Sequence, residues 1–368
     1  MRRILPVVLL VLIMSCKDKE VSIKPRNISN VEVEILLQDS LLNVRALEID
    51  EDDYFGFATS NGKIGGKDFN FKGGNIYVNK ENKQDDYLKE SATVNFQIKH
   101  DTIIPNFRSL AATKNGGFVL GIGNPALLYK IDNDSIKLVY QESHPKAFYN
   151  SMDFWNDDEG IAMGDPTDDC MSIIITRDGG NTWDKLSCND LPKIKEGEAA
   201  FAASDTNISI VGNHTWVATG GKVSRVLYSP DKGYTWEVYE TPIVQGKPTT
   251  GIYSIDFYDE LNGFAIGGDY TNPKDNLENK MLTKDGGKTW KLVAQNETPN
   301  YRSCVQYIPN TNGKELVAIG FEGIDFSHDA GNTWKHISDE GFYTIRFLND
   351  STAYAAGKGR ISKLVFRE

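Results

Sequence analysis

The side chains with the clearest potential for chemistry recur four times with one spacing: Thr or Ser, x, Asp, x, Gly, x, Thr, Trp. A carboxylate beside hydroxyl groups could act as an acid or base, or could bind calcium. The same spacing also suits a tight turn, in which the aspartate accepts backbone hydrogen bonds and the glycine adopts a positive φ. The tryptophan would then pack between neighbouring structural units. We expect these structural roles for Asp178, Gly180, Trp183, Asp231, Gly233, Trp236, Asp285, Gly287, Trp290, Asp329, Gly331 and Trp334.

A second set of charged and polar residues stands at the ends of apolar segments. Arginine binds carboxylates through two parallel hydrogen bonds, so several arginines could converge on one anionic or sugar-like ligand. Alternatively, these residues pair with one another and hold the segments in register. The ligand-binding candidates are Arg45, Arg108, Arg302, Asn124, Asn150, Tyr253, Glu196, Lys222 and Arg225. The catalytic candidates, as acid or base, are Asp165, Asp269 and Glu198.

Seven segments could position these residues, and each reads as an apolar strand, a polar turn and a strand ending in glycine. They begin at Val44, Phe107, Tyr149, Glu198, Ile252, Tyr301 and Tyr343. Most continue into a third strand, a tight turn and a fourth strand. Four antiparallel strands in about 40–60 residues are typical of a β-propeller blade. The sequence therefore predicts an all-β, seven-bladed propeller over residues 31–368, although six or eight blades remain open.

The last segment supplies only three strands, so we expect residues 31–37 to pair into the last blade and close the ring. Residues 66–91 form a polar insertion in the first blade. Because the four strands alternate in direction, the Asp-Gly-Thr-Trp turns lie on one rim of the propeller. The arginine and carboxylate candidates lie on the opposite rim, the top face, where most propellers bind their ligands.

The repeated turn resembles the Asp-box, or bacterial neuraminidase repeat, of sialidases, sortilin-type receptors and the photosystem II assembly factor family. The segments FRSL, MDFWNDDEGIAMGDP, EGEAAFAAS, GGKVSR and IVQGK are similar to envelope lipoproteins related to that assembly factor. Members of that group are often labelled oxidoreductase. The chain has no Gly-x-Gly-x-x-Gly after a strand and no Cys-x-x-Cys, so we expect no redox cofactor. The Arg-Ile-Pro signature of sialidases is also absent, since NFRSL surrounds Arg108.

The N-terminal residues read as a processing signal. Residues 1–15 contain Arg2, Arg3 and a short apolar stretch, as in a secretory signal peptide. Residues 13–16, Ile-Met-Ser-Cys, resemble a bacterial lipobox, which implies that Cys16 carries the lipid of an envelope lipoprotein. Lys17 after the cysteine implies the outer membrane, facing either the periplasm or the cell surface. Residues 16–30 are polar and would tether the domain to the lipid.

The net charge, the cysteines and the histidines bear on nucleic-acid binding, on a disulfide and on a metal site. The formal charge of the 368-residue chain is −11, and removing residues 1–15 makes it −13, which disfavours nucleic-acid binding. Cys170 and Cys188 flank the first repeated turn symmetrically, which predicts a disulfide in an oxidising envelope, with two unpaired thiols as the alternative. Cys304 reads as a buried thiol. The five histidines are scattered, so we expect no metal site.

These observations favour a non-catalytic envelope scaffold or assembly factor that binds a protein or a glycan through its top face. The alternative is a carbohydrate-active hydrolase or lyase that uses the arginines together with the aspartate and glutamate candidates.

Overall fold

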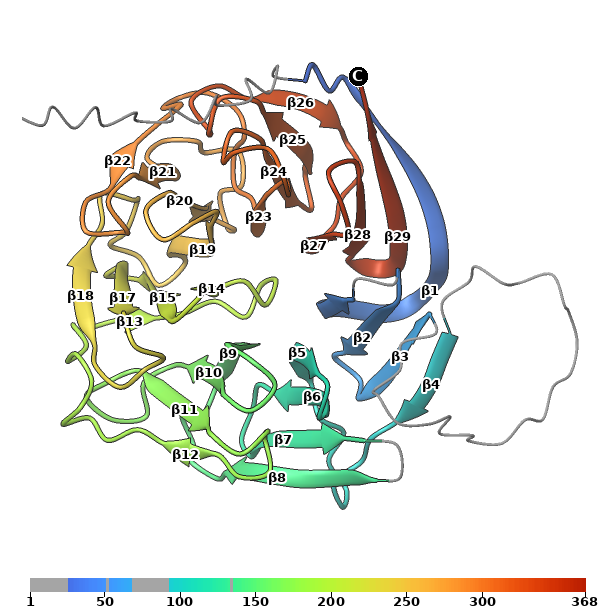
Figure 1. Ribbon diagram of the computed structural model, residues 1–368, viewed down its shortest axis with the longest axis vertical. Helices are drawn as coiled ribbons and strands as arrows, with labels where there is room; N and C mark the ends of the chain where they lie inside the picture. Colours follow the sequence, from blue (N-terminus) through green and yellow to red (C-terminus); the bar gives the residue numbers. More distant parts are fainter. Residues whose placement is uncertain (1–25, 51–52, 68–92, 133–134) are drawn as a thin grey trace, which may run out of the picture.

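The computed structural model describes residues 26–50, 53–67, 93–132 and 135–368. Over these residues the chain forms antiparallel β-sheets without a helix, and so no helix there is long and apolar enough to cross a membrane. The sheets stand side by side in a ring around a common axis (Figure 1). The predictions of an all-β chain and of four-stranded antiparallel units are therefore confirmed. The signal peptide, Cys16 and most of the tether and of the insertion lie outside the described residues.

Four of the sheets consist of four strands, with neighbouring strands antiparallel. The first holds β5 (Phe107–Thr113), β6 (Gly116–Gly121), β7 (Ala126–Ile131) and β8 (Ile136–Glu142). The second holds β9 (Tyr149–Phe154), β10 (Gly160–Gly164), β11 (Ser172–Thr176) and β12 (Asp184–Lys185). The third holds β14 (Ile208–Val211), β15 (His214–Ala218), β17 (Arg225–Ser229) and β18 (Glu237–Glu240). The fourth holds β23 (Cys304–Tyr307), β24 (Leu316–Gly320), β25 (Gly323–Ser327) and β26 (Lys335–Ser338).

Two larger sheets complete the described strands. One contains β19 (Thr250–Phe257), β20 (Gly263–Asp269), β21 (Lys280–Thr283) and β22 (Lys291–Leu292), extended by β13 (Glu198–Ala199) and β16 (Gly220–Gly221). The other runs in the order β27 (Thr344–Phe347), β28 (Thr352–Ala356), β29 (Lys358–Arg367), β1 (Asn30–Ile49), β2 (Phe55–Thr59), β3 (Lys63–Lys67) and β4 (Thr93–Gln97).

The strand β1 belongs to two four-stranded groups. Its first half pairs with β29, with Val31 opposite Phe366 and Val33 opposite Leu364. After a shift in register, its second half pairs with β2. The first and the last described strands, β1 and β29, therefore lie side by side, as the blue and red strands in Figure 1 show.

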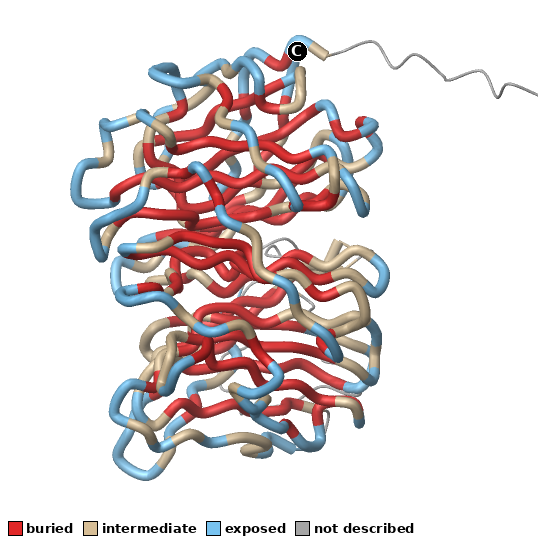
Figure 2. The backbone as a smooth tube through the Cα atoms, turned by 90° about the vertical axis from the view of Figure 1, so that its left-hand side faces the viewer, coloured by how far each residue is buried: buried red, intermediate tan, exposed pale blue. Residues whose placement is uncertain are grey.

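Buried residues run along the strands of each sheet (Figure 2), and the clusters of the hydrophobic core join residues of neighbouring sheets. Along β10, Ile161 and Met163 pack toward Val217 of β15, whereas Ala162 packs toward Phe118 of β6. Each sheet thus buries both of its faces, because a sheet stands on either side of it. This explains why the middle strands are apolar at consecutive positions instead of alternating with polar residues.

The repeated turns have the structure that their sequence predicts. In the first, Asp178 Oδ1 accepts hydrogen bonds from the backbone N–H groups of Asn181 (3.0 Å) and Thr182 (2.9 Å). The hydroxyl of Thr182 donates to Oδ2 at 2.8 Å. Burial opposes ionisation of Asp178, but the hydrogen bonds of the turn outweigh it and lower the pKa of the carboxyl. The carboxylates of Asp231, Asp285 and Asp329 accept the equivalent hydrogen bonds, so each of them is likewise bound to the backbone of its own turn.

The glycine of each repeated turn meets the neighbouring sheet. Gly331 has a φ of +81°, and a Cβ atom placed on it would lie 2.0 Å from the ring of Phe264 in β20. Gly180 stands in the same relation to Phe118 of β6, at 2.1 Å. The tryptophan three residues later packs against the same ring, as Trp334 does with Phe264 at 5.6 Å between ring centroids. Each turn therefore couples its own sheet to the preceding one.

Polar side chains also join the innermost strands across the sheet boundaries. Asp256 of β19 accepts the N–H of Tyr307 in β23 at 2.7 Å. In the same way, Gln306 accepts the N–H of Phe347, and Ser209 accepts the N–H of Phe257. These bonds satisfy N–H groups on strand edges that have no neighbouring strand.

Residues 200–207, which we call the plug, cross the interior of the ring between β13 and β14. The sequence suggested that the innermost strand of this unit begins at Glu198, but that strand begins at Ile208. Small side chains, such as Ala200, Ala202, Ala203 and Ser204, allow the chain to pass close to the axis. The plug forms hydrogen bonds with Arg45, Arg108, Leu110, Met152, Ser254, Ser303, Thr344 and Arg346.

Substituting Gly331→Ala tests the coupling between turn and sheet. The new methyl group would displace Phe264 and also strain a positive φ, so we expect a loss of about 2–4 kcal/mol in the free energy of unfolding. Urea denaturation measures this loss. The control is Gly246→Ala, where φ is +105° but no atom lies within 4 Å of the new Cβ. Equal losses in the two variants would contradict the packing role of Gly331.

Candidate functional site

A cavity of about 430 Å³ opens above the plug, at the strand ends opposite the repeated turns. Its walls come from the beginnings of innermost strands and from the loops that follow second strands. Four of the predicted residues line it: Arg45, Arg108, Asp165 and Tyr253. The aromatic residues in its lining are Phe148, Phe201, Tyr253, Tyr270, Tyr301, Phe321 and Tyr343.

The two arginines of the cavity have no carboxylate partner within 4 Å among the described residues. Instead, Nη1 of Arg45 donates to Ala203 O at 2.7 Å, and Nη1 of Arg108 donates to Ala202 O at 2.9 Å. The guanidinium of Arg45 also lies over the ring of Tyr343, 3.8 Å from its centroid. Burial, with the nearby charge of Arg45, lowers the pKa of Arg108 to about 10. Both groups remain charged at neutral pH, and an anion in the cavity would be strongly favoured.

The aromatic residues form a connected wall. The ring of Phe201 in the plug stacks on Tyr253 of β19 at 3.9 Å, and Tyr253 meets Tyr301 edge-on at 4.8 Å. Tyr253 and Tyr301 are almost fully buried, whereas Tyr270 and Phe321 are 50% and 43% exposed. Exposed aromatic side chains beside a cavity are typical of binding surfaces. Of this wall, Tyr253 alone was a candidate from the sequence, although Tyr301 and Tyr343 each begin one of the seven segments.

Asp165 is the one carboxylate among the described residues that line the cavity. Its Oδ1 accepts hydrogen bonds from Asn150 Nδ2 at 3.0 Å and from the N–H of Ala200 at 2.9 Å. Burial raises the pKa of Asp165 to about 6. A glycosidase needs a second carboxylate about 5–10 Å away, and this lining does not supply one.

Three predicted residues form buried ion pairs away from the cavity. Arg302 donates through Nε and Nη2 to Asp325 Oδ2 at 2.7 and 2.6 Å, and both side chains are at most 4% exposed. Arg225 donates to both carboxylate oxygens of Glu198, from Nε to Oε1 at 3.0 Å and from Nη2 to Oε2 at 2.6 Å. Glu198 also accepts from Thr219 and from the N–H of Lys195, which leaves it no free position for acid/base work. For these three residues the structure favours the alternative of mutual pairing.

The remaining predicted residues lie outside the cavity lining. Asp269 accepts hydrogen bonds from the N–H and hydroxyl of Thr271 and is buried. Glu196 and Lys222 form an exposed pair at 3.5 Å. Asn124 is exposed and precedes a cis peptide bond to Pro125.

A smaller cavity, of about 210 Å³, contains acidic groups of the innermost strands. Glu48, Asp153, Asp205 and Asp256 line it, together with the guanidinium of Arg346. Burial is the main cause that raises the pKa of Asp153 and of Asp256 to about 7, and the pKa of Asp205 is raised well above its usual value. Asp205 belongs to the plug, so the plug lies between the two cavities.

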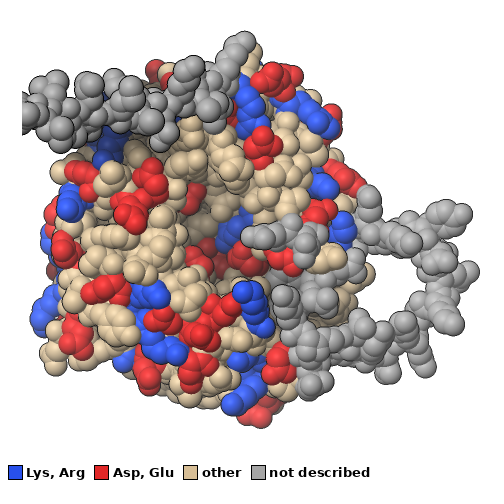
Figure 3. Space-filling model, viewed as in Figure 1, with Lys and Arg blue, Asp and Glu red and all other residues tan. Residues whose placement is uncertain are grey.

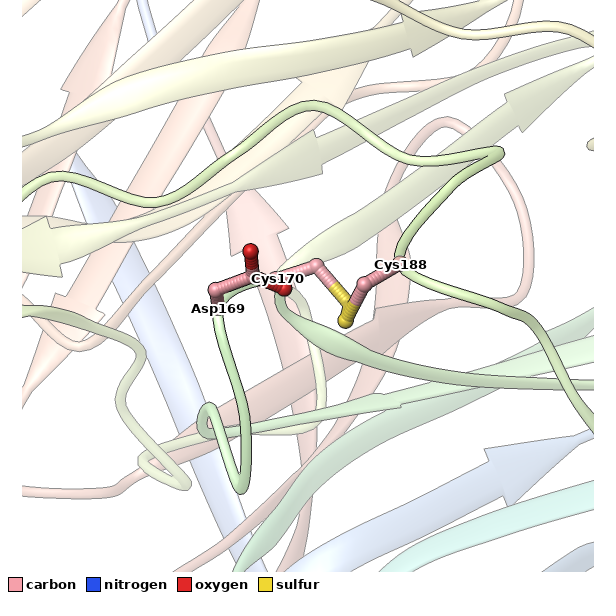
Figure 4. A group of neighbouring side chains, drawn as sticks. All are labelled: Asp169, Cys170 and Cys188. Carbon is pink, nitrogen blue, oxygen red and sulfur yellow. A yellow bond between two sulfur atoms is a disulfide. The ribbon is translucent and has the colours of Figure 1, made fainter.

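Cys170 and Cys188 are joined in a disulfide, with Cα atoms 5.3 Å apart (Figure 4). They lie beyond the paired residues of β11 and β12, where Ile174 opposes Lys185. Asp169 and these two cysteines are the one cluster of three potential metal ligands among the described residues. Because both sulfur atoms are in the disulfide, neither can bind a metal as a thiolate.

Acidic and basic side chains are interspersed over the face that Figure 3 shows, and the described residues on it form no continuous basic patch.

The ring of antiparallel sheets defines the chain as a β-propeller. Among solved structures, one titled "YCF48 bound to D1 peptide" aligns with a TM-score of 0.62 at 12% identity, over 93% of this chain and 98% of that one. "YCF48 from Cyanidioschyzon merolae" aligns with a TM-score of 0.59 at 11% identity, over 92% and 99% of the two chains. The WD40 repeats of RRP9 align equally well, with a TM-score of 0.59 at 11% identity over 94% and 100%. At such identities the likeness shows the fold alone. No protein-family model and no curated protein matches the chain.

Replacing Arg302 by Met would leave Asp325 buried without its main partner. We expect a loss of roughly 3–5 kcal/mol in the free energy of unfolding, measured by urea denaturation. Lys222→Met, which breaks the exposed pair with Glu196, should cost about 0–1 kcal/mol. If both substitutions cost equally little, Arg302 is not a structural residue and would be open to a ligand role again.

The acidic cavity predicts that stability decreases as the pH rises. Asp153 and Asp256 have pKa values near 7 in the folded chain, above the usual value near 3.9. Their contribution to stability is complete below pH ~4 and is lost as the pH rises through ~7. We expect the double variant Asp153→Asn and Asp256→Asn to lose less stability than the wild type between pH 5 and pH 8.

The measurement is a series of urea denaturation curves across this pH range. Asp350→Asn, at an exposed turn, is the control and should keep the wild-type slope. His336 titrates in the same direction in all variants, because its hydrogen bonds to Asp339 and Asp325 outweigh burial and raise its pKa. An unchanged slope in the double variant would show that the two aspartates do not take up protons on folding.

Proposed function

We propose that this chain is a protein-binding β-propeller of the bacterial cell envelope, acting as a scaffold or assembly factor through its top face. The observation that carries the proposal is the pair of guanidinium groups, Arg45 and Arg108, in an aromatic-lined cavity; neither has a carboxylate partner within 4 Å among the described residues. Two neighbouring, partly buried cations favour the binding of an anion, and an aromatic wall suits an apolar group next to that anion.

The nature of the partner is supported by the comparisons. One solved structure with this fold is YCF48 with a bound peptide of D1, so a propeller of this shape does accept a polypeptide. The resemblance to the photosystem II assembly factor family points in the same direction. The comparisons give no such support to a glycan partner, and for a hydrolase the described lining offers a single carboxylate.

The proposal includes seven blades with Asp-box turns and a closed ring. It is supported by the strand pairings, since the first half of β1 adds a fourth strand to β27, β28 and β29. The second half of β1 begins the next group of four. Closure of this kind removes a free sheet edge and holds the first and last described strands together.

The proposal also includes attachment to a membrane through a lipid on Cys16, with residues 16–30 as the tether. This part depends on the sequence alone. An outer-membrane lipoprotein would present the propeller either to the periplasm or to the cell surface.

The test is capture of partners from envelope extracts by the purified full chain, followed by affinity measurement with the captured protein. The double variant Arg45→Gln and Arg108→Gln should lose about 30-fold in affinity, because roughly 2 kcal/mol depends on the charged contacts. Lys222→Gln removes a cation on the same side outside the cavity and should bind normally. Thermal melting of each variant monitors its fold.

A glycan array with the same proteins tests the alternative. Binding of a glycan that depends on both arginines, with no captured protein, would contradict the proposal and favour a carbohydrate-active propeller. Protein capture that is unchanged in the double variant would instead exclude the cavity as the binding site.

A further inference from the structure

The cavity has a closed floor. Ala202 O and Ala203 O of the plug each accept a hydrogen bond from one of the two arginines, and the plug is fixed to the surrounding strands below them. Asp205, for example, accepts the N–H groups of Leu110 and Met152 at 2.9 and 3.1 Å. A chain that enters from the top face therefore cannot continue along the axis.

The floor has unused hydrogen-bond donors. Nε of Arg45 is buried and has no acceptor among the described residues. Nη2 of Arg45 and Nη2 of Arg108 also lack a hydrogen-bond acceptor there, since the bonds of these side chains use Nη1 and, in Arg108, Nε to Asn106. A carboxylate placed between the two arginines can accept from Nη2 of each and neutralise the two charges that burial disfavours.

The wall beside these donors is apolar and fixed in place. The stacked rings of Phe201 and Tyr253, with Tyr301 edge-on to Tyr253, can cover one large apolar side chain. The volume of about 430 Å³ lies at the small end of the range for ligand pockets, roughly 300–1,000 Å³. It suits the end of a chain better than a loop, which would have to enter and leave through the same mouth.

We propose that the cavity captures the C-terminal residue of a partner polypeptide, with its α-carboxylate between Arg45 and Arg108. An aromatic or large aliphatic side chain then lies against Tyr253 and Tyr301. Oδ2 of Asp165, which has no hydrogen-bond donor among the described residues, can accept the N–H of that terminal residue. Capture of a chain terminus by fixed donors is a known mode of peptide recognition. The inference rests on the proposed function and names the part of the partner that is bound.

The experiment uses an array of hexapeptides of sequence Ser-Gly-Ser-Gly-Ser-X, in which X is each of the twenty amino acids. Every peptide is made with a free α-carboxylate and with a C-terminal amide, and both sets are probed with the full chain. We expect binding of the free acids when X is Phe, Tyr, Trp, Leu or Met, and a loss of at least about tenfold on amidation. A further set of C-terminal amides, in which Asp or Glu replaces the Ser before an aromatic last residue, tests side-chain carboxylates.

Two variants locate the binding. Arg45→Gln and Arg108→Gln should each abolish the preference for the free acid, whereas Lys222→Gln should keep it. The comparison of acid with amide is made on the wild-type chain, so it does not depend on how the variants fold.

Equal binding of acids and amides, stronger binding of internal carboxylates, or no binding of any peptide would overturn the inference. The proposed function fails by a different result, namely partner capture that does not depend on the two arginines. Arginine-dependent capture of a protein without recognition of free C-termini would therefore exclude only the chain-terminus mode.

Discussion

The structure depends on how the free edges of its innermost strands are satisfied. Such an edge has N–H groups without a neighbouring strand, and an unpaired buried N–H is costly. Here polar side chains of the preceding sheet accept hydrogen bonds from these N–H groups. Asp256 accepts the N–H of Tyr307, and Ser254 accepts the N–H of Val305. These bonds cross the sheet boundaries, so they hold each sheet at a defined height relative to its neighbour. They also explain why acidic residues are retained close to the axis, where their burial is unfavourable.

The plug extends this principle to the centre of the ring. Its carbonyl groups accept hydrogen bonds from Arg45, Arg108 and Arg346, and Asp205 accepts two N–H groups from different sheets. A single segment thereby divides the interior into an upper cavity with arginines and a lower one with carboxylates. Each of the two arginines donates from one nitrogen to the plug and has at least one further nitrogen without an acceptor among the described residues, so this structural role is compatible with the binding role proposed above.

Much of the fold could be predicted from the sequence, because each repeated unit is specified by residues that are close together along the chain. The turn around Asp178 needs an acceptor, a glycine and a hydroxyl at fixed positions, and those residues are visible without a structure. The site could be predicted only in part. Arg45, Arg108, Asp165 and Tyr253 were candidates and do meet in one cavity, but Arg302 and Glu198 had the same appearance in the sequence. Each of the latter faces an opposite charge across a sheet, Asp325 and Arg225, and this pairing over a long range of sequence cannot be read from the neighbouring residues.

The sequence by itself therefore determined the β-strands, the turns and the division of the chain into repeated units, since these depend on residues close together along the chain. It also determined which residue types were available for a site. Only the tertiary structure decided which charges are paired and which are free. It also revealed the plug, because a run of alanine and serine near Ala202 looks like an ordinary strand until the ring brings distant donors around it. The difference has one physical reason: the burial and pairing of a charge depend on all sheets at once.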